Sequence, residues 1–295
     1  MKLDSNSRWI PAGIPLNSPA LEMNLALESI GLVAGSKSLP LELARLLRAA
    51  GVKRIVCVAA EGHADPALAA LVDEIVWLHP GQINKMIKAF TSRGVTQCVM
   101  AGQIAPKTLF DLRPDLRALG VLMRMKEKNA HTLFGAVVEE LRKDGVETIE
   151  ATPWLAPMMP QTGFHLGPKL SDEQKSDIEF GFKIAKEISR LEIGQIVVVK
   201  NGTVLAVEAF EGTDECLARG GSLAGKDGGA VAVKVAKVGH DMRFDIPCLG
   251  AKTLETCAAA RISVLAVESG KSILLERAAV ETLAQKNKIT ITTVA

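Results

Sequence analysis

The chain has 295 residues, 48% of them hydrophobic and 23% charged, which excludes an intrinsically disordered protein and favours two globular domains. Its 35 Lys and Arg residues nearly balance 33 Asp and Glu residues, so the net charge gives no reason to expect nucleic acid as a partner. Five cysteines without a CxxC pair or a histidine at zinc-ligand spacing predict reduced thiols in a cytoplasmic protein.

Residues 1–24 contain acidic and polar side chains and no continuous apolar core, so they predict an irregular extension rather than a signal peptide or an anchor. No run in the chain approaches the roughly 18 to 20 apolar residues of a spanning helix. We therefore expect a soluble protein, which could still contact a membrane surface.

Residues 25–151 alternate short β-branched apolar runs with amphipathic stretches, the pattern of a parallel sheet covered by helices. Pro40 suits the first turn of the first helix, and Gly51 suits the position just after its end. The predicted strands cover residues 30–35, 53–60, 73–78 and 95–102, and the predicted helices cover 39–50, 81–94, 116–126 and 131–144. This half is predicted to be a Rossmann-like α/β domain.

A stretch at 152–168 contains four prolines and two glycines, so we expect a linker without regular elements. Residues 169–295 are predicted to form a second α/β domain. Its first helix begins with a capping-box pattern at Ser171 and Gln174, and an apolar stripe follows at Ile178, Phe182, Ala185, Ile188 and Leu191.

The second domain continues with strand-like runs. Residues 195–209 predict a hairpin that turns at Asn201-Gly202, because this dipeptide favours a two-residue turn. Further strands are predicted at residues 231–237, 262–268, 271–276 and 288–294, with a helix at 254–261.

The loop after the first strand, 31-GLVAGSKSLP-40, is the first candidate site. Ligands bind beyond the carboxyl ends of strands in open α/β sheets, and a helix N-terminus favours phosphate. Gly35 would permit close backbone approach, and Ser36 and Lys37 could donate to an anion. A tight turn that needs Gly35 for its dihedral angles explains the pattern equally well. The loop is not GxGxxG, which disfavours a nicotinamide cofactor.

Two further candidates lie in the second domain. In 208-EAFEGTDECLARGG-221, Glu211 and Asp214 flank the end of a buried strand, with Gly212 between them; Thr213 or Asp214 could equally be a helix cap. In 268-ESGKSILLE-276, Lys271 could contact phosphate. A P-loop would need glycine where the chain has Leu265, so we favour a turn at Gly270.

The stretch 231-VAVKVAKVGHDMRFDIPCLG-250 is the most informative. Lys234 lies within a buried strand pattern and should either reach water or meet an anion. If the following segment is extended, Asp241, Arg243 and Asp245 project from one face beside His240. Two carboxylates can bind a hard divalent cation, and the basic side chains can hold phosphate oxygens. A solvated edge strand with an Asp–Arg–Asp ion-pair network is the alternative.

Four segments together carry a resemblance to a known family: GLVAGxxxLP at 31–40, VVVKNGTVLAVEAFEGTD at 197–214, KVAKxGxDMRFDIPxxG at 234–250 and AVESGKSILLE at 266–276. They resemble the LpxI-type UDP-2,3-diacylglucosamine pyrophosphatases of lipid A biosynthesis, over roughly residues 26–295. The resemblance implies Mg²⁺- or Mn²⁺-dependent hydrolysis of a lipid-linked nucleotide sugar to UMP and 2,3-diacylglucosamine 1-phosphate, with substrate between the two domains.

The resemblance also implies roles for single residues. It assigns the catalytic, metal-binding carboxylate to Asp245, with Asp241 as a second acidic ligand. Arg243 and Lys234 would then hold the diphosphate oxygens. A diacylated substrate implies a protein that contacts the inner membrane peripherally from the cytoplasm, and a homodimer is left open.

Two other functions compete with this hydrolase. A non-catalytic nucleotide-sugar or lipid-binding protein could keep the fold without turnover. A Rossmann-type oxidoreductase is motivated only by the N-terminal sheet.

Overall fold

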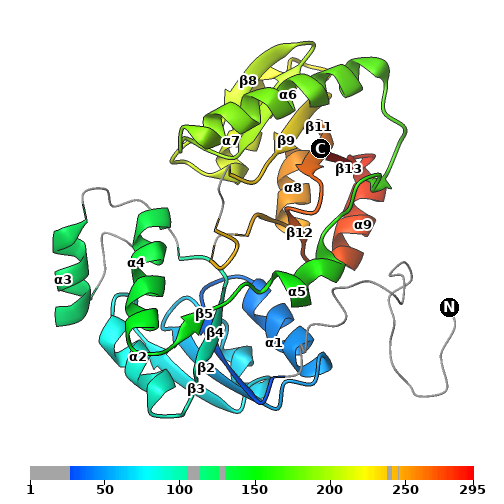
Figure 1. Cartoon of the computed structure of the whole chain (residues 1–295). Coiled ribbons are helices and arrows are strands. Elements are labelled where there is room, and N and C mark those ends of the chain that lie inside the picture. Colours follow the sequence, from blue (N-terminus) through cyan, green and yellow to red (C-terminus); the bar gives the residue numbers. More distant parts are fainter. Residues whose placement is uncertain (1–26, 105–112, 126–129, 238–240, 245) are drawn as a thin grey trace, which may run out of the picture. The chain divides into compact units, whose positions relative to one another are not determined.

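The fold is taken from a computed structural model that describes residues 27–104, 113–125, 130–237, 241–244 and 246–295 (Figure 1). The chain divides into two compact units, Met1–Pro157 and Met158–Ala295. The predicted N-terminal extension, residues 1–24, lies outside the described residues. None of the helices in the described ranges has the length and hydropathy needed to cross a bilayer.

The N-terminal unit is built on a five-stranded parallel sheet with the order β3-β2-β1-β4-β5. The strand order reverses at β1, which confirms the predicted Rossmann-like architecture. The strands are β1 (Ser29–Ala34), β2 (Arg54–Ala60), β3 (Glu74–Leu78), β4 (Gln97–Ala101) and β5 (Glu147–Thr148).

The four predicted helices of the N-terminal unit form within three residues of their predicted bounds, and the short α5 was not predicted. Pro40 lies in the first turn of α1, and Gly51 follows its end with φ +87°. Leu43 and Leu47 of this helix are fully buried, so its apolar face packs in the core. The helices are α1 (Leu39–Ala49), α2 (Ile83–Thr91), α3 (Leu116–Arg124), α4 (Ala130–Lys143) and α5 (Thr152–Leu155), with 3₁₀ turns η2 (Pro66–Ala70) and η4 (Ala156–Met158).

The C-terminal unit is built on a six-stranded mixed sheet with the order β6-β13-β11-β9-β7-β8. Its centre is parallel, because β9 and β13 both run parallel to β11, whereas β7 is antiparallel to β9. The strands of this sheet are β6 (His165–Leu166), β7 (Ile196–Lys200), β8 (Thr203–Val207), β9 (Ala230–Lys234), β11 (Ile262–Glu268) and β13 (Thr290–Val294).

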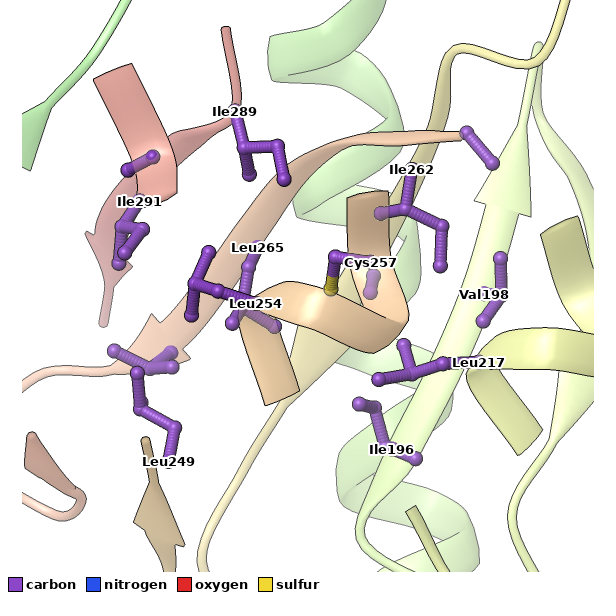
Figure 2. Close-up of a cluster of buried hydrophobic side chains, with 14 of the residues drawn as sticks. Ile196, Val198, Leu217, Leu249, Leu254, Cys257, Ile262, Leu265, Ile289 and Ile291 are labelled. Atoms are coloured by element: carbon purple, nitrogen blue, oxygen red, sulfur yellow. The ribbon is translucent and has the colours of Figure 1, made fainter. Parts of the chain in front are cut away.

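Helices cover both faces of this sheet because side chains alternate along each strand. Val197 and Val199 of β7 pack in the cluster that contains Ile178 and Ala185 of α6 (Asp172–Arg190). Ile196 and Val198 pack on the opposite face, against the helices that Figure 2 shows around Leu217, Leu254 and Cys257. Leu217 belongs to α7 (Thr213–Leu223), and Leu254 and Cys257 belong to α8 (Ala251–Ala259). A third helix, α9 (Arg277–Asn287), adds Val280 and Ala284 to the same cluster.

Two local predictions in this unit are confirmed. The capping box at Ser171 and Gln174 forms at the start of α6. The hairpin turns at Asn201 and Gly202, whose φ angles are +50° and +71°. The carboxylate of Asp177 on α6 accepts hydrogen bonds from both of their backbone N–H groups, at 2.8 and 2.7 Å.

Two other predictions are wrong. Leu191 is 56% exposed rather than buried, because α6 ends before it and Leu191 is the C-cap. The stretch 152–168 contains regular elements, namely α5, η4 and β6. Leu166 of β6 pairs with Ile291 of β13, so the edge of the sheet organises this proline-rich segment.

Candidate functional site

The carboxyl ends of two buried parallel strands lie side by side in the C-terminal unit. β9 ends at Lys234, which pairs with Val267, the residue before the end of β11. The first residue of the antiparallel β7, Ile196, pairs with Lys234 at the same edge. In open α/β sheets, residues beyond the carboxyl ends of strands form ligand sites. We name this edge, together with residues 235–249 that follow β9, the candidate site.

Lys234 is only 8% exposed, and its Nζ donates a hydrogen bond to the carbonyl O of Cys248 at 2.9 Å. One of the three N–H donors of this ammonium thus bonds a main-chain carbonyl, and a substrate anion as a further partner stays a prediction. The bond ties the end of β9 to β10 (Cys248–Leu249) and leaves a buried cationic group that no described carboxylate pairs with.

An ion pair fixes the beginning of the segment that follows β9. The carboxylate of Glu268, at the end of β11, accepts hydrogen bonds from Lys186 Nζ on α6 at 3.0 and 3.1 Å. It also accepts one from the backbone N of Ala236 at 2.9 Å, and Lys186 Nζ donates to the Ala236 carbonyl at 3.1 Å. Both main-chain polar groups of Ala236 are therefore held by one ion pair.

Lys237, a second lysine of the stretch 231–250, forms an ion pair with Glu192. Glu192 lies just beyond the C-cap of α6. Among the described carboxylates, Glu192 thus pairs with Lys237, and none pairs with Lys234.

Residues 241–244 form a turn instead of the predicted extended segment. The backbone N of Phe244 donates to the carbonyl O of Asp241 at 3.3 Å, the i to i+3 bond of a β-turn. Arg243 Nε and Nη2 donate to the two carboxylate oxygens of Asp241 at 2.8 and 2.6 Å, and the Arg243 backbone N donates to Oδ1 at 3.1 Å. The predicted one-face geometry of Asp241 and Arg243 is wrong, because local side-chain bonds favour the turn.

Asp245 and His240 lie outside the described residues. The chain just after Asp245 is fixed, since Pro247 is buried and its carbonyl accepts a hydrogen bond from the backbone N of Ile273 at 2.8 Å. β10 then runs parallel to β12 (Ile273–Leu274). The chain that carries the predicted catalytic carboxylate is thus held upstream by Glu268 at Ala236 and downstream by β12 at Pro247.

The described residues contain no group of three or more His, Cys, Asp or Glu side chains arranged to hold a metal ion. Both oxygens of Asp241 accept hydrogen bonds from Arg243. A carboxylate can accept these bonds and still offer a lone pair to a cation, so Asp241 as a second metal ligand stays a prediction. A Mg²⁺ or Mn²⁺ ion bound through Asp245 stays a prediction.

A buried carboxylate that the sequence analysis missed borders the same edge. Glu208, just after β8, accepts hydrogen bonds from the backbone N of Gln195 and from Thr213 Oγ1, each at 2.8 Å. Gln195 in turn accepts a bond from the backbone N of Val235 at 2.9 Å. Glu208 therefore joins the start of α7 to the residue that follows Lys234.

The predicted cap of α7 at Thr213 or Asp214 is wrong, because the N-cap is Gly212 with φ +89° and no side chain caps the helix. Asp214 pairs with Lys252 of α8 at 3.3 Å. Glu211 pairs with Arg219 at 2.5 Å, and this hydrogen bond lowers the pKa of Glu211 below its ordinary value. Both predicted carboxylates thus have cationic partners within the C-terminal unit.

Residues 269–272 turn from β11 to β12, and Gly270 has φ +63°. This confirms the predicted strand-to-strand turn, which the sequence favoured over a P-loop. The exposed Lys271 follows Glu268 closely, since its backbone N donates to the Glu268 carbonyl at 3.3 Å. Lys271 therefore lies at the same edge of the sheet as the candidate site.

The first predicted loop belongs to the N-terminal unit. Ser36 forms an isolated antiparallel bridge with Gln103, and its hydroxyl donates to the Gln103 carbonyl at 2.6 Å. A Cβ on Gly35 would lie 2.8 Å from that same carbonyl O, so close backbone approach explains this glycine. The positive φ of the loop, +72°, occurs at the exposed Lys37 instead. Gly35 is therefore not needed for its dihedral angles.

Sequence reasoning missed three side chains that organise the candidate site: Lys186, Glu208 and Glu268. A signal was present for the two glutamates, because each directly follows or ends an apolar β-branched run, where a charged side chain reaches the sheet edge. Lys186 had none. It adjoins the buried Ala185 of α6, and only tertiary packing brings it to β11.

Comparison with known families and proteins gives one consistent result. The chain matches the model of the LpxI N-terminal domain over residues 29–158 and the model of the LpxI C-terminal domain over residues 161–292. It is 32% identical over 263 residues to the UDP-2,3-diacylglucosamine pyrophosphatase LpxI of Caulobacter vibrioides, covering 86% of this chain and 93% of the relative.

Among solved structures, glycinamide-RNase-transformylase T from Mycobacterium tuberculosis matches with a TM-score of 0.23 and 14% identity. The match covers 61% of this chain and 44% of that chain. A likeness this low carries no argument about fold or function.

Proposed function

This chain belongs to the LpxI family, and from that membership we propose that it hydrolyses the pyrophosphate bond of UDP-2,3-diacylglucosamine in lipid A biosynthesis. The match to the Caulobacter vibrioides pyrophosphatase, which extends over both units, carries the proposal. Water added across the P–O–P linkage yields UMP and 2,3-diacylglucosamine 1-phosphate.

The negative charge of the diphosphate is the main obstacle to this reaction, because it repels the lone pair of the attacking water oxygen until the diphosphate oxygens are neutralised. Lys234 supports the proposal, as a buried ammonium at the carboxyl edge of the sheet. Arg243 would contribute its guanidinium, held in a fixed orientation by Asp241. Asp241 would orient Arg243 and remains our second candidate for a metal-binding carboxylate.

Asp245 is the residue to which we assign the catalytic carboxylate. When bound, Mg²⁺ or Mn²⁺ would neutralise diphosphate oxygens, and a carboxylate is the donor type that such hard cations prefer. The described residues on either side of Asp245 support this assignment, since the ion pair of Lys186 and Glu268 holds Ala236 and a backbone bond holds Pro247.

The loop at Gly35, Ser36 and Lys37 stays our proposal for a substrate contact in the N-terminal unit. It follows β1 at the point where the strand order of the sheet reverses, the position at which such sheets bind nucleotides. Ser36 already uses its hydrogen to reach Gln103, so it would offer a ligand only acceptor lone pairs. Lys37 is exposed and would be the cation of this loop.

Release of UMP from UDP-2,3-diacylglucosamine in the presence of Mg²⁺ tests the proposal directly. We expect turnover by the wild-type protein, loss of at least about a thousandfold in Asp245→Asn, and unchanged turnover in Asp172→Asn, whose carboxylate is 94% exposed on α6. Absence of UMP release by wild type with Mg²⁺ and with Mn²⁺ would overturn the proposal. If the UDP-sugar bound without hydrolysis, the protein would be a non-catalytic binding protein instead.

The acyl chains of this substrate reside in a membrane. We therefore also propose that the protein works at the cytoplasmic face of the inner membrane, which it contacts peripherally. Recovery of the native protein with washed membranes at low salt, and its release at high salt, would test this location.

A further inference from the structure

α3 carries apolar side chains on two opposite faces. Ala118 and Val121 are buried, and the helix contacts α2. Leu116, Leu119 and Met123 are 88%, 42% and 86% exposed. At 3.6 residues per turn these three side chains fall within an arc of about 60°, opposite the buried face. We name Leu116, Leu119 and Met123 the α3 stripe.

The α3 stripe is held in place by polar contacts at the start of the helix. Asp115 caps it, accepting hydrogen bonds from the backbone N of Ala118 at 2.9 Å and of Asn84 at 2.7 Å. Arg117 donates to the Glu140 carboxylate of α4 at 2.6 Å, and α3 and α4 stand beside each other in Figure 1. The three exposed side chains of the α3 stripe therefore lie on a helix that is fixed to its neighbours.

The charges around the stripe favour an anionic partner. Residues 113–125 contain three arginines, at positions 113, 117 and 124, against one aspartate. That aspartate is occupied as the helix cap, and Arg117 is paired with Glu140 and Asp144. Arg124 lies 3.6 Å from Glu140 but its side chain is 68% exposed, and Arg113 is exposed as well. An exposed apolar stripe with exposed arginines beside it is typical of a helix that lies in a membrane interface.

The size of the stripe disfavours a second protein copy as the occupant. A stable protein interface buries about 800 Å² per partner, far more than three side chains on two helical turns provide. A bilayer sets no such requirement, since each apolar side chain that enters it contributes independently. We infer that the α3 stripe docks on the surface of an anionic lipid bilayer.

This inference extends the proposed function, because a diacylated substrate resides in a membrane, but its test measures binding rather than turnover. The full chain is mixed with phosphatidylethanolamine–phosphatidylglycerol vesicles, and the bound fraction is measured by flotation. We expect the double substitution Leu116→Gln with Met123→Gln to weaken binding about tenfold or more, since two apolar side chains no longer insert.

The matched control is Leu191→Gln with Leu223→Gln, which changes two leucines that are 56% and 59% exposed in the C-terminal unit. This control should bind vesicles as wild type does, and both double variants should keep the wild-type melting temperature. We also expect Arg124→Gln to weaken binding to the anionic vesicles and to leave binding to pure phosphatidylcholine unchanged.

Four results would overturn the inference. Wild-type protein could fail to float with the vesicles, or the α3 double variant could bind them normally. Alternatively, the double variant could convert a dimer to a monomer, or lose substrate affinity in detergent while vesicle binding persists. A dimer result would assign the stripe to a second copy, and a detergent result would assign it to substrate acyl chains.

Discussion

Lys186 Nζ lies 3.0 and 3.1 Å from the two carboxylate oxygens of Glu268, and together these side chains bond both main-chain polar groups of Ala236. The pair is largely shielded, with side chains 27% and 16% exposed. It joins α6, β11 and the chain that leaves β9. Because Asp245 follows nine residues later, this ion pair is the upstream anchor of the proposed catalytic segment.

Glu268→Ala should lower both stability and turnover. The substitution leaves the Lys186 ammonium and the Ala236 N–H without their acceptor, which costs about 3 to 5 kcal/mol for a shielded pair. Glu268→Gln keeps a carbonyl acceptor for Ala236, so it should cost less. We expect kcat to fall about tenfold in Glu268→Gln and more in Glu268→Ala, because small displacements of a catalytic group are costly. UMP release and thermal melting measure the two effects.

The control for this series is Glu28→Gln, which breaks the exposed Lys53–Glu28 pair in the N-terminal unit. It should change neither quantity, since exposed pairs contribute little. A folded Glu268→Ala protein with wild-type kcat would show that the ion pair does not position the catalytic segment.

Lys234→Met should reduce turnover with a small effect on stability. Methionine fills the space of the apolar stem, and removing a buried charge offsets the lost hydrogen bond to Cys248. We expect kcat to fall about tenfold or more, because the diphosphate loses a cation. Lys200→Met is the matched control, since Lys200 Nζ also donates to a backbone carbonyl, that of Ala224, but at the opposite edge of the sheet. Equal losses in both variants would contradict a role in catalysis.

One thiol should react with Ellman's reagent at pH 8 in the native protein. Burial raises the pKa of Cys57, Cys216 and Cys257 to about 12 and of Cys98 to about 11, so these four stay protonated and shielded. Cys248 is only partly buried. We expect one rapid equivalent that disappears in Cys248→Ser, and five after unfolding. Rapid reaction of two or more thiols in Cys248→Ser would contradict the structure.

The stabilising effect of Glu140 should disappear in acid. Hydrogen bonds from Lys143 and Arg117 hold the pKa of this buried carboxyl below its ordinary value of 4.5. The folded state therefore binds the proton less readily than the unfolded state, and the stabilisation is present above pH 4.5 and lost as the pH falls through the lower folded pKa.

Urea unfolding of wild type and Glu140→Gln at pH 7, 4 and 3 measures this effect. At pH 7, wild type should have the higher urea midpoint, and its free energy of unfolding should exceed that of Glu140→Gln by about 1 to 3 kcal/mol. At pH 3, the free energies of unfolding of the two proteins should be equal. Glu179→Gln, an exposed position on α6, should match wild type throughout. A difference between Glu140→Gln and wild type that is independent of pH would rule out the ionised carboxylate as its cause.

Local sequence signals predicted much of the fold because the forces behind them act over a few residues. The capping box at Ser171 joins groups three positions apart, and the turn at Asn201-Gly202 needs only two positive φ angles. The alternation of apolar runs likewise predicted the parallel sheet around β1, since a strand buried on both faces has to be apolar throughout.

The candidate site was predicted only in part. The sequence directed attention to Lys234 and to residues 241–245, and the resemblance assigned the chemistry. The extended geometry assumed for Asp241 and Arg243 was wrong, since hydrogen bonds between side chain and backbone close a turn there. Gly35 was correctly expected at a close backbone approach, but the neighbour is residue 103 of its own unit rather than a ligand.

The sequence by itself determined many of the strands and helices, although not α5, β6 and α9, because periodicity, caps and turns depend on neighbours within a few positions. Only the tertiary structure decided which distant charges meet, as Lys186 and Glu268 do across 82 residues. A charged side chain is compatible with many partners, and its position in the chain does not specify which one folding will place within hydrogen-bond distance.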